Sequence, residues 1–245
     1  MTDDPFPGVP QTCRSLGVIT PSDFALDREL WHWIPESVSL HLTRLSPAGR
    51  EAPTAQRPFA SAQSLGEAVR AVSVVRPQAV AYDCAAGSAV LGRAGEQRLC
   101  ASMEQAGGVP AVTTSGALVD ALREAAAQRV AMVTPCSESV TAVLKGYLAE
   151  AGISVSGAAC PAVPCRAWRL TYREVVGLAR RAVSRDADAL FVSCPNLPTY
   201  DVLPELEAEL GIVVLSANQV TLRAALKATA ESDRAARTRC GTSAL

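Results

Sequence analysis

QAVAYDC at residues 78–84 and DALFVSC at residues 188–194 decide the fold of this chain. Each stretch is a short run of mostly apolar residues that ends in a cysteine. Continuous apolar runs of this length predict strands that are buried on both faces, as in a parallel sheet. Because the same pattern occurs twice, the sequence points to two similar units.

Two further pairs of stretches keep the same order along the chain. SLGVITPS (15–22) matches RVAMVTPC (129–136), and EQAGGVPAVTTS (104–115) matches EAELGIVVLSAN (207–218). Three matched pairs in order indicate a duplication, with a boundary near 115–128. The alternative is a coincidental likeness between repetitive β and α segments.

Strands and helices are expected to alternate along the whole chain. Apolar runs predict strands at 15–20, 38–45, 78–83, 110–114, 129–134, 153–159, 189–193 and 212–216. The intervening stretches predict helices at 24–33, 61–75, 88–106, 116–127, 138–151, 171–185, 200–210 and 219–230. This alternation predicts an α/β fold with two Rossmann-like lobes, each with a parallel four-stranded sheet, related by a pseudo-twofold axis.

The predicted lobes divide the sequence near its middle. Residues 14–115, joined by a C-terminal helix at about 219–230, form the first lobe, and residues 116–218 form the second. Polar, charged or proline-rich composition predicts flexible tails at 1–13 and 231–245.

The composition fits a globular enzyme and argues against several classes of partner. The chain has 245 residues, of which 49% are hydrophobic and 19% charged, and its formal net charge is -1. This charge gives no attraction to nucleic acid or to an anionic membrane. No apolar run is long enough to span a bilayer, and no signal-peptide core is evident. We expect a cytoplasmic protein that acts on a small molecule; its oligomeric state stays open, with a homodimer as the commonest assembly.

The cysteines form neither a metal-binding nor a disulfide pattern. The chain has eight of them, at positions 13, 84, 100, 136, 160, 165, 194 and 240, and only two histidines. No C-x-x-C spacing occurs, so we expect no zinc or other metal site. In a cytosolic chain of this length, thiols are favoured over disulfides. Most of these cysteines are expected to be small buried hydrophobic residues.

Cys84 and Cys194 differ from the others because each ends a strand of the matched pair. Ligands of parallel α/β sheets bind outside the carboxyl ends of the strands. If the lobes pack with these ends facing each other, the two thiols flank a cleft between the lobes. The N–H groups of the helix that follows each cysteine would favour its thiolate. We therefore predict that Cys84 and Cys194 are the catalytic residues.

Two opposed thiols suit the isomerisation or racemisation of a small molecule. One thiolate can remove a proton from one face while the other thiol delivers a proton to the opposite face. Alternatively, one thiolate adds to a double bond and later leaves. The sequence leaves this choice open.

Polar residues at the other strand ends are candidate substrate-binding groups. Hydroxyl and backbone N–H groups there can hold a carboxylate without a dedicated arginine. The alternative is that the hydroxyl groups cap the helices that follow. The candidates are Ser22, Asp23, Thr114, Ser115, Thr134 and Cys136.

Four stretches of the chain resemble one branch of a known superfamily. VITPSDF (18–24), YDCAAGS (82–88), VTPCSES (133–139) and the run from 193 to 219 resemble the maleate cis-trans isomerase and arylmalonate decarboxylase branch of the aspartate/glutamate racemase superfamily. The resemblance implies two α/β lobes, an active site in the cleft between them, no cofactor and one cysteine from each lobe. The decarboxylase has glycine at the first cysteine position. Since this chain has Cys84 there, the resemblance favours an isomerase or racemase.

The chain departs from the family pattern at several substrate-binding positions. Maleate isomerases have asparagine where this chain has Phe24, and tyrosine where it has Cys136. The decarboxylase has Thr-Ser at the positions of Ala85 and Ala86. These changes predict a roomier and more apolar pocket.

The position after the second cysteine also affects substrate binding. Pro195 lacks a backbone N–H, so we expect Asn196 to supply the donor instead. Asp23 would repel a substrate carboxylate if it pointed inward. A substrate with one acidic group, or a larger and less polar one, therefore fits better than maleate.

Our principal prediction is a cofactor-independent isomerase or racemase for a small carboxylate-bearing substrate. Three alternatives stay open. The chain could be an arylmalonate-type decarboxylase that uses Cys194 alone, or a transferase or hydrolase with a covalent intermediate on Cys194. It could also be a non-catalytic binding protein of the same fold, because several of the family's carboxylate ligands are missing.

Overall fold

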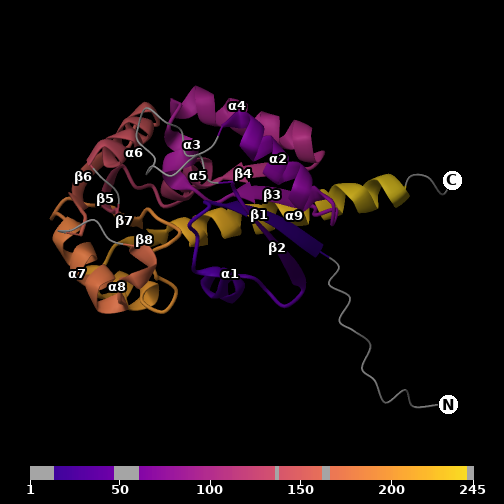
Figure 1. Cartoon of the computed structure of the whole chain (residues 1–245). Coiled ribbons are helices and arrows are strands. Elements are labelled where there is room, and N and C mark those ends of the chain that lie inside the picture. The colour runs from indigo at the N-terminus through magenta and orange to yellow at the C-terminus, as the bar shows by residue number, and fades with distance from the viewer. Residues whose placement is uncertain (1–13, 47–60, 136–137, 162–165, 242–245) are drawn as a thin grey trace, which may run out of the picture.

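The computed structural model describes residues 14–46, 61–135, 138–161 and 166–241, with side chains described up to residue 232. Within this part of the chain, two sheets are each covered by helices (Figure 1). The candidate site residue Cys136 and the predicted flexible tail at 1–13 lie outside the described residues.

The first sheet is built from the amino-terminal half of the chain. Its four parallel strands lie in the order β2 (Val38–Arg44), β1 (Arg14–Thr20), β3 (Ala79–Tyr82) and β4 (Ala111–Thr113). All four residues of β3 are buried, which explains why this strand is apolar at every position rather than at alternate ones.

The second sheet repeats this order with strands from the carboxyl-terminal half. Its parallel strands are β6 (Ser154–Ala159), β5 (Arg129–Val133), β7 (Ala189–Val192) and β8 (Val213–Ser216), in that spatial order. The predicted fold of two parallel four-stranded α/β units is confirmed. The strand that precedes each candidate cysteine, β3 or β7, is the third strand of its sheet in this order.

Helices connect consecutive strands and cover both sheets. Those of the first half are α1 (Asp27–Trp33), α2 (Ala62–Ser73), α3 (Ala85–Ala89), α4 (Gly92–Gly107) and α5 (Thr114–Glu124). Those of the second half are α6 (Glu138–Glu150), α7 (Tyr172–Ala182), α8 (Leu203–Leu210) and α9 (Ala217–Gly241). Among the described helices, none is both long and apolar enough to cross a membrane.

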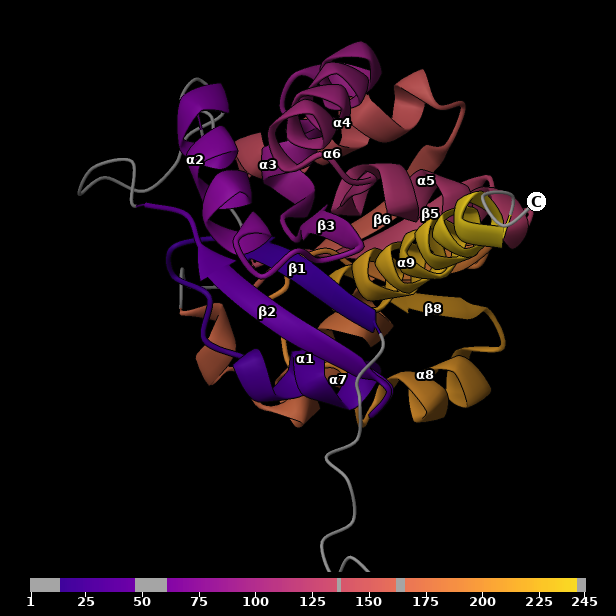
Figure 2. The same cartoon turned by 90° about the vertical axis from the view of Figure 1, so that its right-hand side faces the viewer.

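Two helices connect the lobes by crossing from one to the other. α5 follows the first sheet, but its Leu118 and Leu122 pack in a cluster with Met132 and Phe191 of the second. α9 follows the second sheet, and its Leu222 packs in the core of the first. Figure 2 shows α9 beside both β1 and β8, with which it makes contacts. The lobes are therefore interlocked, although the exact lobe boundaries stay a prediction.

Several helix boundaries differ from the prediction. The helix expected at 88–106 is two helices, because Gly92 has a positive φ of 68° and separates α3 from α4. The first helix begins at Asp27 rather than at 24. The last helix, expected to end at about 230, continues to Gly241 as α9, and the flexibility expected from 231 stays a prediction. The polar sequence there contains good helix formers, and polarity alone does not end a helix.

Gly157 allows β6 to lie close to the end of α7. The register of β6 against β5 shifts next to this residue, and a Cβ at Gly157 would overlap the carbonyl oxygen of Ala182. We expect Gly157→Ala to lower the free energy of unfolding by about 1–3 kcal/mol. Gly146→Ala in α6 is the matched control, since a Cβ there meets nothing within 4 Å. It should raise stability by about 0.5–1 kcal/mol. Urea denaturation measures the stability of both variants. Equal stability of the two would contradict the close approach of β6 to α7 at Gly157.

Candidate active site

The two candidate catalytic cysteines occupy equivalent positions in the two sheets. Cys84 follows the end of β3, and Cys194 follows the end of β7. Cys84 is buried, with 5% of its surface exposed, and Cys194 is half-buried. Both are thiols rather than halves of a disulfide. Each therefore lies at the carboxyl end of a parallel strand, where α/β sheets bind their ligands.

The backbone of α3 is directed at the sulfur of Cys84. Cys84 is the N-cap of this helix, and its Sγ accepts a hydrogen bond from the Gly87 N–H at 3.3 Å. A donor at this distance favours the thiolate over the neutral thiol. The phenol of Tyr82 lies beside them, and burial, followed by the charge of Cys84, raises the pKa of Tyr82 well above 10. Tyr82 therefore stays protonated next to the sulfur.

The turn that carries Cys194 is attached to the first lobe. Asn196 is buried, and its side chain accepts a hydrogen bond from the Ala25 N–H at 2.9 Å. The same amide donates to the Asp23 carbonyl at 3.1 Å. Ala25 and Asp23 belong to the loop after β1. The strand ends of the two sheets thus meet, as the pseudo-twofold arrangement predicted.

Asp83, next to Cys84, is fully buried at the junction of the lobes. The hydroxyl groups of Thr114 and Thr221 each lie 3.3 Å from its Oδ1, and they lie 2.8 Å from each other. Its Oδ2 has no hydrogen-bond partner among the described residues. Burial raises the pKa of Asp83 from 3.8 to about 7, and the charge of Glu29 adds to this increase. The end of β3 is thereby connected to α5 and to α9.

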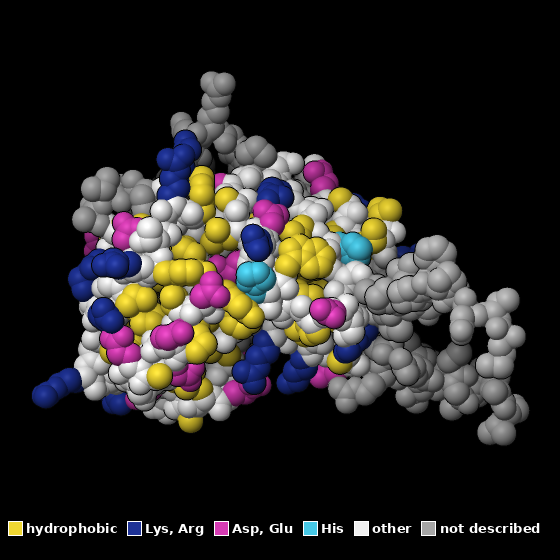
Figure 3. All heavy atoms as spheres, turned by 90° about the horizontal axis from the view of Figure 1, so that it is seen from below, with side chains coloured by type: hydrophobic (Ala, Val, Ile, Leu, Met, Phe, Trp, Pro, Cys, Tyr) yellow, Lys and Arg dark blue, Asp and Glu magenta, His cyan; other side chains and the backbone are white. Residues whose placement is uncertain are grey.

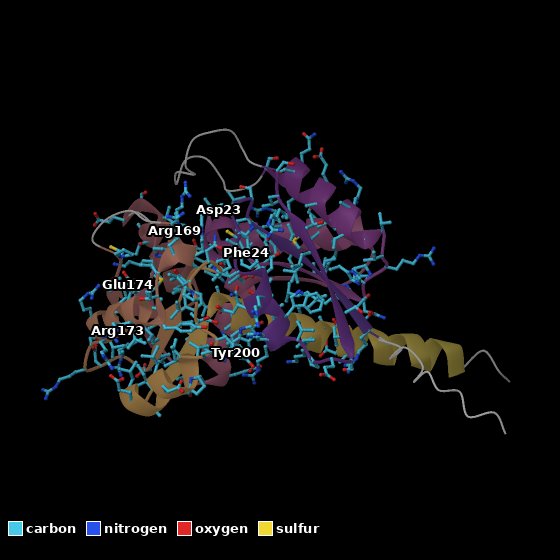
Figure 4. The ribbon with its side chains drawn as sticks, turned by 60° about the horizontal axis from the view of Figure 1, so that its bottom comes forward. Asp23, Phe24, Arg169, Arg173, Glu174 and Tyr200 are labelled. Atoms are coloured by element: carbon cyan, nitrogen blue, oxygen red, sulfur yellow. The ribbon has the colours of Figure 1, made fainter. Side chains whose placement is uncertain are left out.

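The loop after β1 holds three predicted substrate-binding residues in different environments. Ser22 and Asp23 are exposed, whereas Phe24 is 4% exposed and packs in the core of the first lobe. Figure 4 shows Asp23 and Phe24 on the first lobe and Arg169 on the second. The N-cap of α1 is Leu26, so the alternative of Ser22 as a helix cap is wrong. The core packing of Phe24 gives no support to its predicted role in widening a pocket.

The hydroxyl groups after β4 bind protein groups. Ser115 is fully buried and donates to the Ala85 carbonyl at 2.7 Å, and Ser88 donates to its Oγ at 2.8 Å. The Thr114 hydroxyl lies within hydrogen-bonding distance of Asp83, as described above. α5 is capped by Thr113, so Ser115 is not its cap. These bonds connect α3 to α5, and the predicted role of both hydroxyls as carboxylate ligands has no support here.

The remaining predicted residues are also largely buried. Ala85 and Ala86 form the first turn of α3 and are 1% and 7% exposed. Thr134 is buried after β5, and its N–H donates to the Ala159 carbonyl at 3.0 Å. Pro195 is buried, and its carbonyl accepts from the Asn218 side chain at 3.1 Å. Their roles in substrate binding stay predictions.

Two cavities are found among the described residues, and neither Cys84 nor Cys194 lines them. One, of about 370 Å³, lies between α4, β4 and α5 and is bordered by Cys100. The other, of about 280 Å³, lies beside α7 and is bordered by Arg173 and Glu174, which Figure 4 labels on the second lobe. In the described part of the chain, no group of three or more His, Cys, Asp or Glu could hold a metal ion.

The surface has no large area of one charge sign in the view seen from below. Figure 3 shows Lys and Arg side chains interspersed with Asp and Glu on this face of the described residues. Hydrophobic side chains lie between them, and Trp31 is 48% exposed. This mixture matches the near-neutral net charge of the chain.

The absence of a side chain at Gly87 leaves space for the Tyr82 hydroxyl and the Cys84 sulfur. A Cβ at Gly87 would overlap the Tyr82 hydroxyl and would lie 3.0 Å from the Cys84 sulfur. We expect Gly87→Ala to destabilise the fold by about 1–3 kcal/mol, because buried Tyr82 cannot move away. The Tyr82 hydroxyl lies next to the Cys84 sulfur and has no other hydrogen-bond partner among the described residues. We therefore expect Tyr82→Phe to cost at most about 1 kcal/mol. Tyr82→Phe should also restore part of the stability of Gly87→Ala in a double-mutant cycle. If the stability changes of Gly87→Ala and Tyr82→Phe, measured by urea denaturation, simply add in the double variant, the methyl group added by Gly87→Ala and the Tyr82 hydroxyl do not collide.

The fold and the site together define a class of protein. Two α/β lobes have the same strand order, a thiol follows the same strand in each, and the strand ends of the two lobes are joined. These features define a class of two-lobed α/β proteins that carry a thiol at the equivalent strand end of each lobe. The family model of arylmalonate decarboxylase matches residues 59–241, and the chain belongs to this family.

Curated relatives include an arylmalonate decarboxylase and maleate isomerases. Arylmalonate decarboxylase of Bordetella bronchiseptica is 32% identical over 138 residues, which cover 52% of this chain and 55% of the relative. Maleate isomerase of Nocardia farcinica is 29% identical over 222 residues, which cover 83% of this chain and 85% of the relative. The match to the decarboxylase, like that to a Geobacillus stearothermophilus maleate isomerase, spans about half the length of the relative.

Solved structures show the same architecture. Nocardia farcinica maleate cis-trans isomerase bound to TRIS is 25% identical, with a TM-score of 0.76 over 88% of this chain and 92% of that chain. A mutant of the same enzyme, 24% identical and also with a TM-score of 0.76, carries a covalently bound succinylcysteine intermediate. The resemblance seen in the sequence is confirmed.

Proposed function

We propose that this chain is a cofactor-independent isomerase or racemase that acts on a small carboxylate-bearing molecule through Cys84 and Cys194. The observation that carries the proposal is the placement of one thiol after the equivalent strand of each sheet. The hydrogen bonds of Asn196 to the loop after β1 support it, because they hold the strand ends of the two lobes together.

The proposed isomerisation needs one nucleophile and one proton donor. A thiolate adds to one alkene carbon, and the other thiol gives its proton to the adjacent carbon, which yields a thioether with a carbon–carbon single bond. After rotation about that bond, the second thiolate takes a proton back and the first sulfur leaves as a thiolate. The succinylcysteine intermediate of the Nocardia farcinica enzyme mutant supports this covalent route.

Racemisation would use the same two sulfur atoms without covalent addition. One thiolate removes a proton next to the carboxylate, and the opposite thiol returns a proton to the other face. The Gly87 N–H at the sulfur of Cys84 favours the thiolate form that either route requires.

A decarboxylase that acts through Cys194 alone is the second candidate. The family match and the 32% identity to arylmalonate decarboxylase favour it. The presence of a thiol at Cys84, beside the Gly87 N–H, favours the two-thiol reaction instead. The expected cytoplasmic location and homodimer stay predictions.

The test compares three substrates in deuterated water. Maleate, its half-amide maleamate and phenylmalonate are each incubated with the protein and followed by proton NMR. A two-thiol isomerase produces the trans isomer of maleate or maleamate, whereas a decarboxylase produces phenylacetate and carbon dioxide. Decarboxylation retained in Cys84→Gly would favour the second candidate. The absence of any turnover, together with equal and slow alkylation of all thiols by iodoacetamide, would contradict both.

A further inference from the structure

Glu29 is a buried carboxylate of the first lobe that binds groups of the second. It lies on α1 and is 8% exposed. Its two oxygens lie 3.2 and 3.1 Å from the Thr199 N–H nitrogen. Oε1 also accepts a hydrogen bond from the Thr199 hydroxyl at 2.6 Å and one from the Asn218 amide at 3.4 Å. All of these donors come from the second lobe.

The groups that bind Glu29 also hold the turn after Cys194. Thr199 lies at the end of this turn, and the Leu197 N–H donates to the Cys194 carbonyl at 3.0 Å within it. The amide of Asn218 donates both to Glu29 and to the carbonyl of Pro195, the residue next to Cys194. A chain of two hydrogen bonds thus runs from the Glu29 carboxylate through the Asn218 amide to Pro195, the residue that follows Cys194.

Two neighbouring contacts attach the same turn to the first lobe. Asn196 binds the loop after β1, as described above. Tyr200 packs against α1, with its ring centre 4.7 Å from Trp33 and 4.9 Å from His32. Figure 4 shows Tyr200 where the lobes meet. The turn from Cys194 to Tyr200 is therefore held to the first lobe at three residues, Asn196, Thr199 and Tyr200.

The chemistry of Glu29 indicates more than packing. An ionised carboxylate is costly to bury unless hydrogen bonds compensate it, and an apolar side chain would fill the same space without that cost. Burial raises the pKa of Glu29, whereas the hydrogen bonds of Thr199 and Asn218 lower it. A carboxylate accepts several hydrogen bonds at once in fixed directions, so it can orient a turn that an apolar residue could only cover.

We propose that Glu29 is a positioning residue, which fixes the Cys194–Thr199 turn from the opposite lobe and so directs the second thiol toward the site. The role of Glu29 in catalysis rests on the proposed function, because it requires that Cys194 is a catalytic residue. The anchoring of the turn does not depend on that assumption and can be measured separately.

The test uses Glu29→Ala and Glu29→Gln in the full chain, with Glu36→Ala as the control for loss of an exposed acid near the same helix. Hydrogen exchange of peptides spanning 194–202 is compared with that of α7, in the same lobe. In Glu29→Ala, exchange at 194–202 should quicken by about tenfold or more, with a smaller effect in Glu29→Gln, which keeps one acceptor oxygen. Exchange in α7 should change by less than about twofold.

The reactivity of the thiols provides the second measurement. Iodoacetamide alkylation is followed separately at Cys84 and Cys194 by peptide mass spectrometry, at neutral pH. In Glu29→Ala, the rate at Cys194 should change by about threefold or more while the rate at Cys84 stays within about twofold. A uniform change at both thiols would indicate a merely structural role and would overturn the inference.

Failure of the inference and failure of the proposed function give different results. Unchanged exchange at 194–202 in folded Glu29→Ala would overturn the anchoring role, whatever the reactivity of the thiols. A wild-type Cys194 that reacts no faster than Cys100 would overturn the proposed function, while the exchange data would still decide the anchoring. If Glu29→Ala does not fold, Thr199→Val replaces it, because this change removes the 2.6 Å hydroxyl bond and leaves the N–H contacts.

Discussion

Replacing Cys84 or Cys194 with alanine is expected to lower kcat by more than about 10³-fold in each single variant. When two catalytic groups act in one reaction, removal of either group stops the reaction. In the proposed reaction each thiol serves one side of the substrate, so neither can replace the other. For the same reason, the double variant should be about as inactive as either single variant. Turnover of the best substrate from the NMR comparison is the measurement.

Cys100→Ala is the matched control for the loss of a thiol. The Cys100 sulfur donates to the Ala111 carbonyl at 2.9 Å, and burial, with the charges of Glu104 and Glu96, raises the pKa of Cys100 to about 12. Such a thiol is protonated at neutral pH and should be dispensable. A Cys84→Ala enzyme that keeps its activity while Cys194→Ala loses it would contradict the two-thiol reaction and favour decarboxylation.

Asp83→Asn is expected to remove a pH dependence of stability that amounts to as much as about 4 kcal/mol, because one pKa unit corresponds to about 1.4 kcal/mol. The pKa of Asp83 is raised from 3.8 to about 7 in the folded protein, mainly by burial. Between these values, the folded state binds more protons than the unfolded state. The free energy of unfolding of the wild type should therefore fall as pH rises from about 4 to about 7, and the loss should be complete above that range.

Asparagine at position 83 stays neutral and keeps a carbonyl oxygen for the hydroxyls of Thr114 and Thr221. The variant should therefore be more stable than the wild type at about pH 8, with little difference at about pH 4. Urea denaturation across this range measures the effect. Asp120→Asn, on the exposed side of α5, is the control. If Asp83→Asn and Asp120→Asn show the same pH dependence, burial does not determine the titration of Asp83.

The fold could be predicted because its signals are local. The four residues of β3 and the four of β7 are all buried, and this burial requires a continuous apolar run. The repeated strand pattern was visible because both halves place a cysteine after the equivalent strand. The break between α3 and α4 was missed, since it depends on the positive φ of Gly92 rather than on hydrophobic periodicity.

The candidate site could be predicted only in part. The positions of Cys84 and Cys194 follow from the strand pattern, but the partners of the hydroxyl groups do not. Ser115 was expected to face a substrate, and it binds the Ala85 carbonyl instead. Asp83 and Glu29 were missed altogether. The one signal for Asp83 was a charged residue at the end of a buried strand, directly before the cysteine.

The sequence by itself determined two α/β lobes and one thiol at an equivalent strand end in each, because apolar runs and their repetition are properties of neighbouring residues. Only the tertiary structure decided which polar groups meet. Glu29 binds Thr199 across 170 positions of sequence, and Asp83 binds Thr221 across 138. Such pairs, and the raised pKa values that burial gives their carboxyl groups, arise from how the lobes pack against each other.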